Sequence, residues 1–273
     1  MVGTKKRVVF ITLATILLLI CIFPYIYMVL QSMAPWNQVD KSLFPTALTL
    51  RSYVFLESAG GKVSMPWIGS FFNSLLVSFG STFLQLGTAM LAAYAISIIK
   101  FRGAKLLGSF VLFQMFFPTI IFLLPNFMII KTLHITNNYL GMILPLSISA
   151  WAVFIYSNFF QGLPKEVLNA AKVDGAGEIR IAWSIVLPMT RSITTILFLF
   201  LFMGRWNELM WDMIAVSDVK LKTLNVLLSS MFGPYGGYPG PLYAASVILS
   251  IPLIILFLIF SKNFKEGMNF VLK

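Results

Sequence analysis

The sequence has very few of the side chains that form disulfides, bind metals or act as catalytic bases. Its 273 residues include one cysteine, Cys21, one histidine, His134, and nine acidic residues. A single cysteine excludes a disulfide within the chain, and these few ligands fall short of the sets that hold zinc or haem. No nucleophile–base pair can be identified either. We therefore expect no metal, no cofactor bound by this chain and no enzymatic activity.

Charged residues of either sign are also scarce, and apolar residues replace them. Charged residues make up 11% of the chain and apolar residues 59%. A soluble domain is roughly half apolar and about a quarter charged. The composition therefore indicates an integral membrane protein. The net charge of +11 does not indicate nucleic-acid binding, because Lys and Arg stand at the ends of apolar runs rather than on one soluble face.

Six apolar segments are long enough to cross a membrane, which takes about 20 residues. They predict an all-α membrane protein that forms a single transmembrane domain over residues 1–273. The first segment follows Lys5, Lys6 and Arg7 but is longer than the apolar part of a signal peptide, so we interpret it as an uncleaved span. Interior prolines, Pro118 and Pro145 among them, predict kinks. The six predicted spans are 8–29, 72–98, 106–130, 139–160, 192–216 and 242–261.

The positively charged residues predict the orientation of these spans. Most Lys and Arg residues fall in the segments 1–7, 99–105, 161–191 and 262–273, which the six-span arrangement puts on one side of the membrane. Cytoplasmic loops carry an excess of Lys and Arg. Both termini and the connection after the fourth span are therefore predicted to be cytoplasmic.

That connection, residues 163–188, is unusual because it is polar and rich in small residues. Pro164 and Glu166 favour the start of a short helix, and Gly175 can take the left-handed conformation that ends one. A second helix is predicted from Glu178 until Leu187-Pro188 stops it. One interpretation is a helical hairpin that docks on a cytoplasmic partner, with Ala170 and Ala171 fitting closely into a groove. The alternative is a hairpin lying on lipid headgroups, although its first helix lacks the Trp, Phe and Leu face that lipid burial requires.

The same segment resembles the EAA loop in the permease subunits of ABC importers. That loop reads EAA, three residues, Gly, nine residues, Ile, one residue and Leu-Pro. Here Ala170-Ala171 is followed at those spacings by Gly175, Ile185 and Leu187-Pro188, with Asn169 in place of the usual Glu. Further motifs resemble carbohydrate-importer permeases of the maltose type, namely Asn73-Ser74-Leu75-Leu76, Ala92-Ala93-Tyr94-Ala95, Phe101-Arg102-Gly103, Trp206-Asn207-Glu208 and Lys222-Thr223-Leu224.

The resemblance implies a fold, a function and a set of partners. The fold is that of type I ABC importer permeases, six spans with a cytoplasmic coupling-helix loop. The function is that of one of two homologous pore-forming permease subunits, which take up a sugar from an extracellular binding protein across a bacterial or archaeal inner membrane. ATP and Mg belong to two partner ATPase subunits. The residues that this implies for ATPase coupling are Asn169, Ala170, Ala171, Asp174 and Gly175.

The outer loop before the last span corresponds, by the same resemblance, to the segment that reaches toward the binding protein. Its residues Tyr235, Gly236, Gly237 and Tyr238 offer aromatic faces on a flexible backbone, although the same composition is typical of a plain surface turn.

Ionisable residues within the fifth predicted span are candidates for a role in the pathway or the subunit interface. Such residues are costly in a membrane and are often functional. Arg205, Glu208 and Asp212 have the spacing of one helical face, on which Arg205 and Glu208 can pair, and Asn207 lies among them. The alternative is a self-neutralising pair near the outer end.

An ion-coupled secondary transporter remains the alternative function. That class tends to show internal repeats and a midplane ion relay. The sequence shows no repeat and offers only the Arg205 cluster as a relay.

Overall fold

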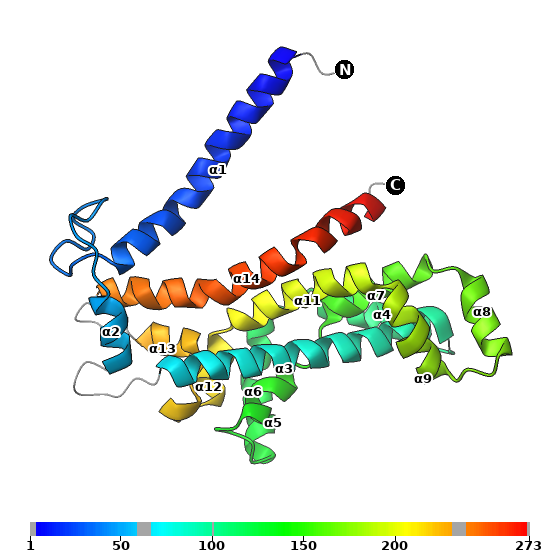
Figure 1. Cartoon of the computed structure of the whole chain (residues 1–273). Coiled ribbons are helices and arrows are strands. Elements are labelled where there is room, and N and C mark those ends of the chain that lie inside the picture. The colour runs from blue at the N-terminus through cyan, green and yellow to red at the C-terminus, as the bar shows by residue number, and fades with distance from the viewer. Residues whose placement is uncertain (1–3, 59–66, 100, 231–238, 272–273) are drawn as a thin grey trace. The chain divides into compact units, whose positions relative to one another are not determined.

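The computed structural model describes residues 4–58, 67–99, 101–230 and 239–271. Within these ranges the chain consists of helices and turns, without a strand (Figure 1). Three helices are long and apolar enough to cross a membrane, and the number rises to six if each of three bent helix pairs counts as one span. The prediction of an all-α, multi-pass membrane protein is confirmed.

The three long helices cover the first, second and sixth predicted spans. They are α1 (Thr4–Ser32), α3 (Trp67–Tyr94) and α14 (Pro239–Val271), and a π-helical turn, Ala95–Ile99, continues α3. Two prolines lie inside these helices, Pro24 in α1 and Pro252 in α14. In the most apolar stretch of α1 no residue is buried within the chain. This helix therefore offers an apolar surface on all sides to lipid or to another subunit.

The third predicted span is not one straight helix. It consists of α4 (Ala104–Gln114), a 3-10 turn (Thr119–Phe122) and α5 (Leu123–Thr132), and the two halves are bent by 101°. Pro118 lies at the bend with φ −59° and ψ 130°. Proline disfavours helical geometry in the residue before it and removes a backbone donor, which accounts for the break.

The fourth predicted span is also broken, at residues 147–149. Its first half is α6 (Tyr139–Ile143) with the 3-10 turn Leu144–Leu146, its second half is α7 (Ala150–Gln161), and they are bent by 46°. The Ser149 hydroxyl accepts a bond from the Ala152 N–H and so caps α7. Such a cap satisfies one of the free N–H groups at a helix start, so the sequence supports a new helix at this position.

The fifth predicted span, 192–216, differs most from the expectation. Helix α11 (Arg191–Trp206) ends before the polar residues, and a separate helix, α12 (Met210–Ala215), follows. The helical run before α11 consists of α9 (Glu178–Ile181), a π turn (Ala182–Val186) and α10 (Leu187–Met189), and it meets α11 at a bend of 86°. The prediction of one continuous helix over 192–216 was wrong.

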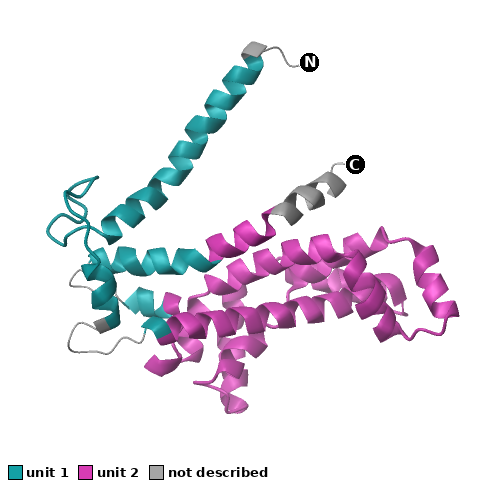
Figure 2. Cartoon of the chain, in the orientation of Figure 1, with its two compact units in different colours: residues 1–68, 226–252 teal, residues 69–225, 253–273 magenta. Residues whose placement is uncertain are grey.

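The described chain divides into two compact units (Figure 2). Unit 1 comprises residues 1–68 and 226–252 and includes α1, α2 (Arg51–Ser58) and the start of α14. Within it, the Asp40 carboxylate accepts hydrogen bonds from the hydroxyls of Tyr27 at 2.9 Å and Tyr243 at 2.6 Å. These two bonds tie the loop after α1 to α1 itself and to the first turns of α14.

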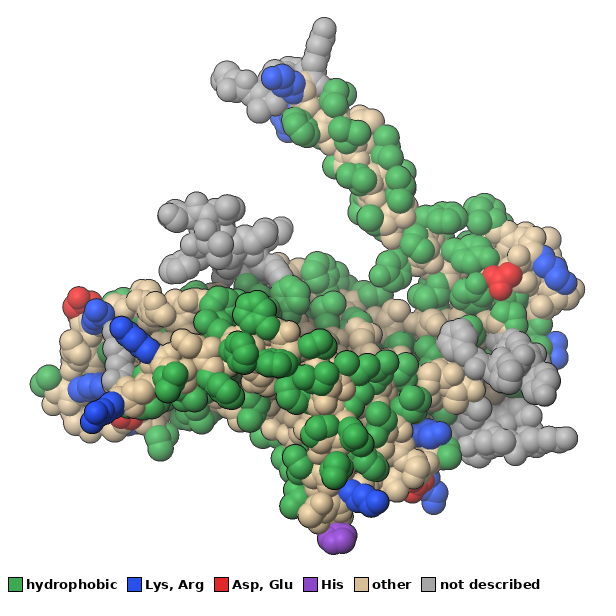
Figure 3. Space-filling model, turned by 180° about the vertical axis from the view of Figure 1, so that it is seen from behind, with side chains coloured by type: hydrophobic (Ala, Val, Ile, Leu, Met, Phe, Trp, Pro, Cys, Tyr) green, Lys and Arg blue, Asp and Glu red, His purple; other side chains and the backbone are tan. Residues whose placement is uncertain are grey.

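Unit 2 comprises residues 69–225 and 253–273 and contains the broken spans. Its core packs α3, α5, α6 and α12 together around the fully buried Trp211, and a run of aromatic rings joins α3 to α11. On the face drawn in Figure 3, hydrophobic side chains cover most of this unit, and a group of Lys and Arg side chains lies at the end that carries α8 (Lys165–Val173). The core residues are Val77, Ile130, Met142, Ile143, Trp211, Ala215 and Val216.

Candidate functional site

The first predicted helix of the 163–188 segment is present as α8. We expected Pro164 to occupy the first helical position. It is instead the N-cap, Lys165 is the first helical residue, and Glu166 lies in the first turn. Leu168 and Ala171 are buried against the rest of unit 2, with 7% and 8% of their surfaces exposed. The opposite face of α8 is free, so the helix is held by one side and presents the other.

The turn after α8 requires glycine because of its backbone conformation. Gly175 has φ +78°, and a Cβ built on it would meet nothing within 4 Å. Two bonds close the turn, from the Gly175 N–H to the Lys172 carbonyl at 3.1 Å and from the Ala176 N–H to the Ala171 carbonyl at 3.0 Å. Together they form a Schellman motif, in which the residue after the helix is left-handed and is usually glycine. The predicted role of Gly175 in ending the helix is confirmed.

The second helix of the segment ends later than predicted. Leu187-Pro188 does not stop it, because Pro188 lies at the start of α10 and the bend follows at Thr190. In a regular α-helix the proline ring would clash with the carbonyl four residues earlier. Here the wider π turn, Ala182–Val186, precedes Pro188 and accommodates it. The helical run therefore continues to Met189.

A chain of polar contacts joins the end of α3 to both sides of the Gly175 turn. The Tyr94 hydroxyl donates to Glu178 Oε2 at 2.5 Å, and Lys172 Nζ lies 2.7 Å from Glu178 Oε1. Lys172 is in the last turn of α8, and Glu178 is in the first turn of α9. The buried Tyr94 thus fixes a hairpin that otherwise lies largely at the surface. We did not predict this link, because sequence spacing does not reveal which residue Tyr94 meets.

The same contacts determine the charge of Glu178. Its hydrogen bond with Lys172 and its hydrogen bond from Tyr94 lower the pKa of this carboxyl. A lowered folded-state pKa means that the contact stabilises the hairpin above the ordinary glutamate pKa and is lost as the pH falls through the lowered value. The link is therefore intact throughout the neutral pH range.

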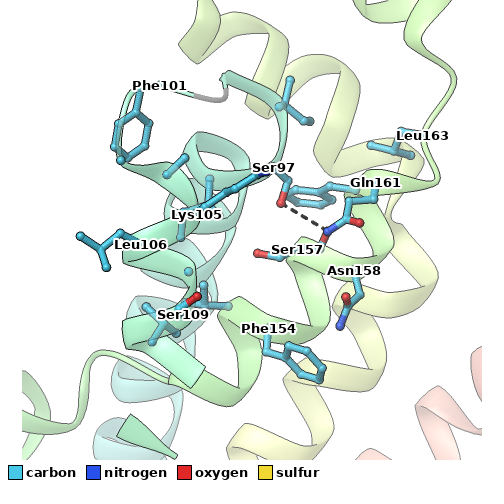
Figure 4. A pocket seen from close by; sticks show the side chains of 18 of the residues that line it. Ser97, Phe101, Lys105, Leu106, Ser109, Phe154, Ser157, Asn158, Gln161 and Leu163 are labelled. Carbon is cyan, nitrogen blue, oxygen red and sulfur yellow. Dashed lines mark hydrogen bonds between the residues drawn. The ribbon is translucent and has the colours of Figure 1, made fainter. Parts of the chain in front are cut away.

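A cavity of about 1270 Å³ lies between α8, α4, α7 and the π turn that follows α3. Figure 4 shows the Lys105 side chain reaching across it from α4 toward Ser97, and Phe101 and Leu106 lie at its edge. On the α7 side the Ser97 hydroxyl donates to the Ser157 carbonyl at 3.3 Å. Asn169, at the position where the EAA pattern has Glu, is among the residues that line the cavity.

The predicted coupling residues therefore do not all face the same way. Asn169, Ala170, Asp174 and Gly175 are exposed, whereas Ala171 is buried against the chain's own core. Only one of the two alanines is thus available to a partner's groove.

The charged residues at the end of the fifth predicted span form a buried ion pair. Arg205 pairs with Asp212 and not, as predicted, with Glu208. Arg205 Nη2 lies 2.5 Å from Asp212 Oδ1, and each side chain is 2% exposed. Arg205 also donates to the Ser81 hydroxyl and the Met142 carbonyl. The pair thus joins α11 and α12 to α3 and α6.

The predicted pairing of Arg205 with Glu208 was wrong, because the helix breaks between them. Glu208 Oε1 instead accepts the Trp211 N–H at 3.0 Å at the start of α12. Asn207 is exposed and donates to the Met203 carbonyl in the last turn of α11. The i, i+3, i+7 spacing assumed a continuous helix, which the chain does not form here. Of the four predicted residues, Arg205 and Asp212 are buried and only Asn207 is exposed.

The predicted binding-protein contact residues Tyr235, Gly236, Gly237 and Tyr238 lie outside the described residues. Their role stays a prediction.

Solved structures identify the fold. The chain is similar to the crystal structure of a bacterial ABC transporter involved in the import of the acidic polysaccharide alginate, with a TM-score of 0.81 and 21% identity over 96% of this chain and 98% of that chain. The broken and continuous spans described above therefore form an ABC importer permease fold.

Sequence comparison identifies the family. A family model described as the binding-protein-dependent transport system inner membrane component matches residues 85–269. The chain belongs to this family and is a permease subunit of an ABC importer.

Individual relatives match nearly the whole chain. The arabinooligosaccharides transport system permease protein AraQ of Bacillus subtilis is 30% identical over 92% of this chain and 90% of its own length. The trehalose/maltose transport system permease protein MalG of Thermococcus litoralis is 31% identical over 97% of this chain and 95% of its own. The sn-glycerol-3-phosphate transport system permease protein UgpE of Yersinia enterocolitica is 31% identical over 85% of this chain.

Proposed function

We propose that this chain forms half of the pore of an ATP-driven importer for a sugar or oligosaccharide. A second homologous permease subunit forms the other half, two ATPase subunits bind and hydrolyse ATP with Mg, and an extracellular binding protein delivers the substrate. The named transport systems of AraQ and MalG support a sugar as substrate. The most apolar stretch of α1, in which no residue is buried within the chain, supports contact with lipid and with the second permease.

The observation that carries the ATPase partnership is the exposed surface around the Gly175 turn. Val173 and Ile179 flank this turn and are 87% and 74% exposed. The chain itself leaves these two apolar side chains uncovered at the tip of a polar hairpin, which supports their burial against a partner. The short α8, anchored through Leu168 and Ala171, then has the geometry of a helix that lies in a partner's groove. Movement of the ATPase subunits would reach the spans through α8 and the Tyr94–Glu178–Lys172 contacts.

The orientation follows from the same partnership. The ATPase subunits work in the cytoplasm, so the 163–188 segment and both termini lie on the cytoplasmic side of the bacterial or archaeal inner membrane. The excess of Lys and Arg in the segments predicted for that side supports this orientation.

The ion-coupled alternative is not favoured, because the charged group of the fifth span is already neutralised. Asp212 accepts two hydrogen bonds from the Arg205 guanidinium. A midplane relay needs an ionisable group that exchanges protons or ions with a water-filled path. A carboxylate closed off by a buried arginine does not meet this requirement.

The test is uptake into liposomes that contain this chain with its second permease and ATPase subunits. Labelled arabinose- and maltose-type oligosaccharides are supplied with the binding protein outside, and ATP is enclosed inside. Uptake should require enclosed ATP and the binding protein and should persist when ionophores abolish all ion gradients. Uptake without ATP that collapses with the ion gradient would contradict the proposal.

Replacing Tyr94 by phenylalanine should weaken coupling without preventing assembly. The change removes one hydrogen bond to a charged group, whose net value of roughly 1.5 kcal/mol corresponds to about a ten-fold change in an equilibrium. Because Glu178 is half-exposed, we expect a smaller loss, about three- to five-fold, in binding-protein-stimulated ATP hydrolysis. The rate in the assembled transporter measures it.

Tyr156→Phe is the matched control. It removes another buried hydroxyl, which donates to Thr194 at 3.0 Å, and neither residue belongs to the 163–188 segment. Stimulated hydrolysis should be unchanged in this variant. Equal losses in both variants would indicate a general loss of stability and would remove Tyr94 from the coupling path.

A further inference from the structure

The cavity between α4, α7 and α8 has the charge pattern of an anion site. Its described lining includes Lys105, Lys165 and Lys172 and no Asp or Glu. Lys172 is paired with Glu178. Within the described part of the chain, Lys105 and Lys165 have no carboxylate within ion-pair distance. Two positive charges are therefore available at one cavity.

Two helix starts add to this positive potential. Helices α4 and α8 begin at the cavity, at Ala104 and Lys165, and neither N-cap residue supplies a side-chain acceptor. The first N–H groups of a helix have no acceptor within the helix, and its N-terminus carries a partial positive charge. Lysine in a first turn is unfavourable next to that charge, and here both helices have one, Lys105 and Lys165. The Ala104 N–H already donates to the Phe101 carbonyl at 3.0 Å, and Glu166 lies in the first turn of α8, so a bound anion would meet the two lysines and the remaining free N–H groups.

Amide and hydroxyl groups complete the lining. Asn158, Gln161 and Asn169 line the cavity from α7 and α8, and Ser97 and Ser109 line it from the side of α3 and α4. The amide N–H groups and the Ser109 hydroxyl can donate to phosphate oxygens, whereas the Ser97 hydroxyl already donates to the Ser157 carbonyl. The available volume of about 1270 Å³ is larger than a free inorganic anion needs, which favours an anion that is part of a larger molecule.

The outer surface of α4 indicates what that molecule is. Beyond the lysine, α4 exposes Leu106, Phe110 and Phe113, with 78%, 65% and 57% of their surfaces accessible. These residues belong to a membrane-spanning segment, so their surface suits acyl chains. Basic pockets between transmembrane helices on the cytoplasmic side bind anionic headgroups. We propose that this cavity holds the phosphate headgroup of an anionic phospholipid of the cytoplasmic leaflet, with its acyl chains along α4.

Such a lipid would brace the coupling helix. Lys165, Leu168, Asn169 and Lys172 of α8 line the cavity, so a bound headgroup would link α8 to α4 and α7. This consequence rests on the proposed coupling role of α8. Asn169 offers a neutral N–H donor where the EAA pattern has an acid. A negative charge at that position would repel the bound anion.

The test measures lipid retained by the complete transporter. The complex is assembled in nanodiscs of equal parts phosphatidylglycerol and phosphatidylcholine, extracted in mild detergent, and analysed for co-purified lipid. The double variant Lys105→Gln/Lys165→Gln should bind phosphatidylglycerol about twenty-five-fold more weakly and so retain much less of it, since each surface lysine contributes about a five-fold change. Lys105→Arg/Lys165→Arg should retain it. Lys131→Gln/Lys220→Gln, with the same change in net charge, should behave as the wild type.

Three outcomes would overturn the proposal. Equal retention in all variants would show that the lysines do not hold the lipid. Binding of inorganic phosphate to this cavity, without retained phosphatidylglycerol, would identify a free anion instead. A cross-link from Leu106→Cys to the second permease subunit would show that protein, not lipid, covers α4. Retention is measured without ATP or substrate, so a transporter that binds the lipid but fails in ATP-driven uptake contradicts only the proposed function.

Discussion

A Gly175→Val variant is expected to insert and assemble normally but to lose nearly all binding-protein-stimulated ATP hydrolysis and uptake. Gly175 has φ +78°, and its Cβ position is empty, so the defect comes from the backbone and not from a clash. The left-handed conformation costs a residue with a Cβ about 2 kcal/mol, and a β-branched residue more, which shifts the turn away from its native form by roughly thirty-fold. Uptake and stimulated hydrolysis in liposomes measure the effect.

Two further variants separate conformation from side-chain size. Gly175→Asn should retain substantial activity, because asparagine tolerates the left-handed region better than other residues. Gly177→Ala is the matched control, since Gly177 lies two residues away with φ −68° and open space around its Cβ position. It should transport almost as well as the wild type. If Gly175→Val also transports almost as well as the wild type, the turn is not part of the coupling path.

Breaking the buried ion pair is expected to have the largest effect on stability. Arg205→Ala or Asp212→Ala leaves an uncompensated charge at a site where both side chains are 2% exposed. Loss of one partner of such a pair costs about 3–5 kcal/mol. Thermal unfolding of the purified permease assembly should show a large drop in midpoint for both single variants.

Replacing both partners should cost less than replacing either one. Arg205→Met/Asp212→Leu removes both charges and keeps most of the volume, and such replacements are often close to neutral. The Ser81 hydroxyl still loses its donor, whereas the Met142 carbonyl keeps the bond from Trp211 Nε1, so the recovery should be large but incomplete. Asn207→Ala, at an exposed position beside the pair, should change stability by no more than about 0.5 kcal/mol. A double variant as unstable as the single variants would show that Arg205 and Asp212 do not act as a pair.

Short-range signals explain what the sequence predicted correctly. The start of α8, the glycine that ends it and the EAA spacing all depend on residues within a few positions of one another. Gly175 could be identified because few residues other than glycine favour the left-handed turn that closes a Schellman motif. Apolar run lengths likewise predicted the three continuous helices, since α1, α3 and α14 contain no stronger interruption than a single proline.

The errors arose where tertiary contacts decide the local structure. The segment 192–216 is apolar enough for one span, yet the chain breaks at Asn207, and this allows Asp212 to approach Arg205. Helical spacing placed Arg205 beside Glu208 only on the assumption of an unbroken helix. The contact between Tyr94 and Glu178 joins residues 84 positions apart, and no spacing rule detects it. The lysine cavity likewise forms from four segments that only the fold brings together.

The position of Asn169 also changes the interpretation of the coupling segment. A glutamate there would add a negative charge to a cavity lined by three lysines. The neutral amide preserves the positive character of the cavity, while Val173 and Ile179 offer apolar contacts at the tip. Under the proposed function, contact with the ATPase would therefore rely on the shape and apolar surface of the hairpin more than on a charge at position 169.

The most direct test of this account is site-directed cross-linking between the hairpin and the ATPase subunit. Cys21 is exposed and is first replaced by serine, after which Val173→Cys and Ile179→Cys each introduce one thiol beside the Gly175 turn. In the assembled transporter both should cross-link to the ATPase, and Lys131→Cys, an exposed position at the end of α5, should not. If the thiols at 173 and 179 react with soluble reagents but never cross-link to the ATPase, the hairpin does not couple ATP hydrolysis to transport.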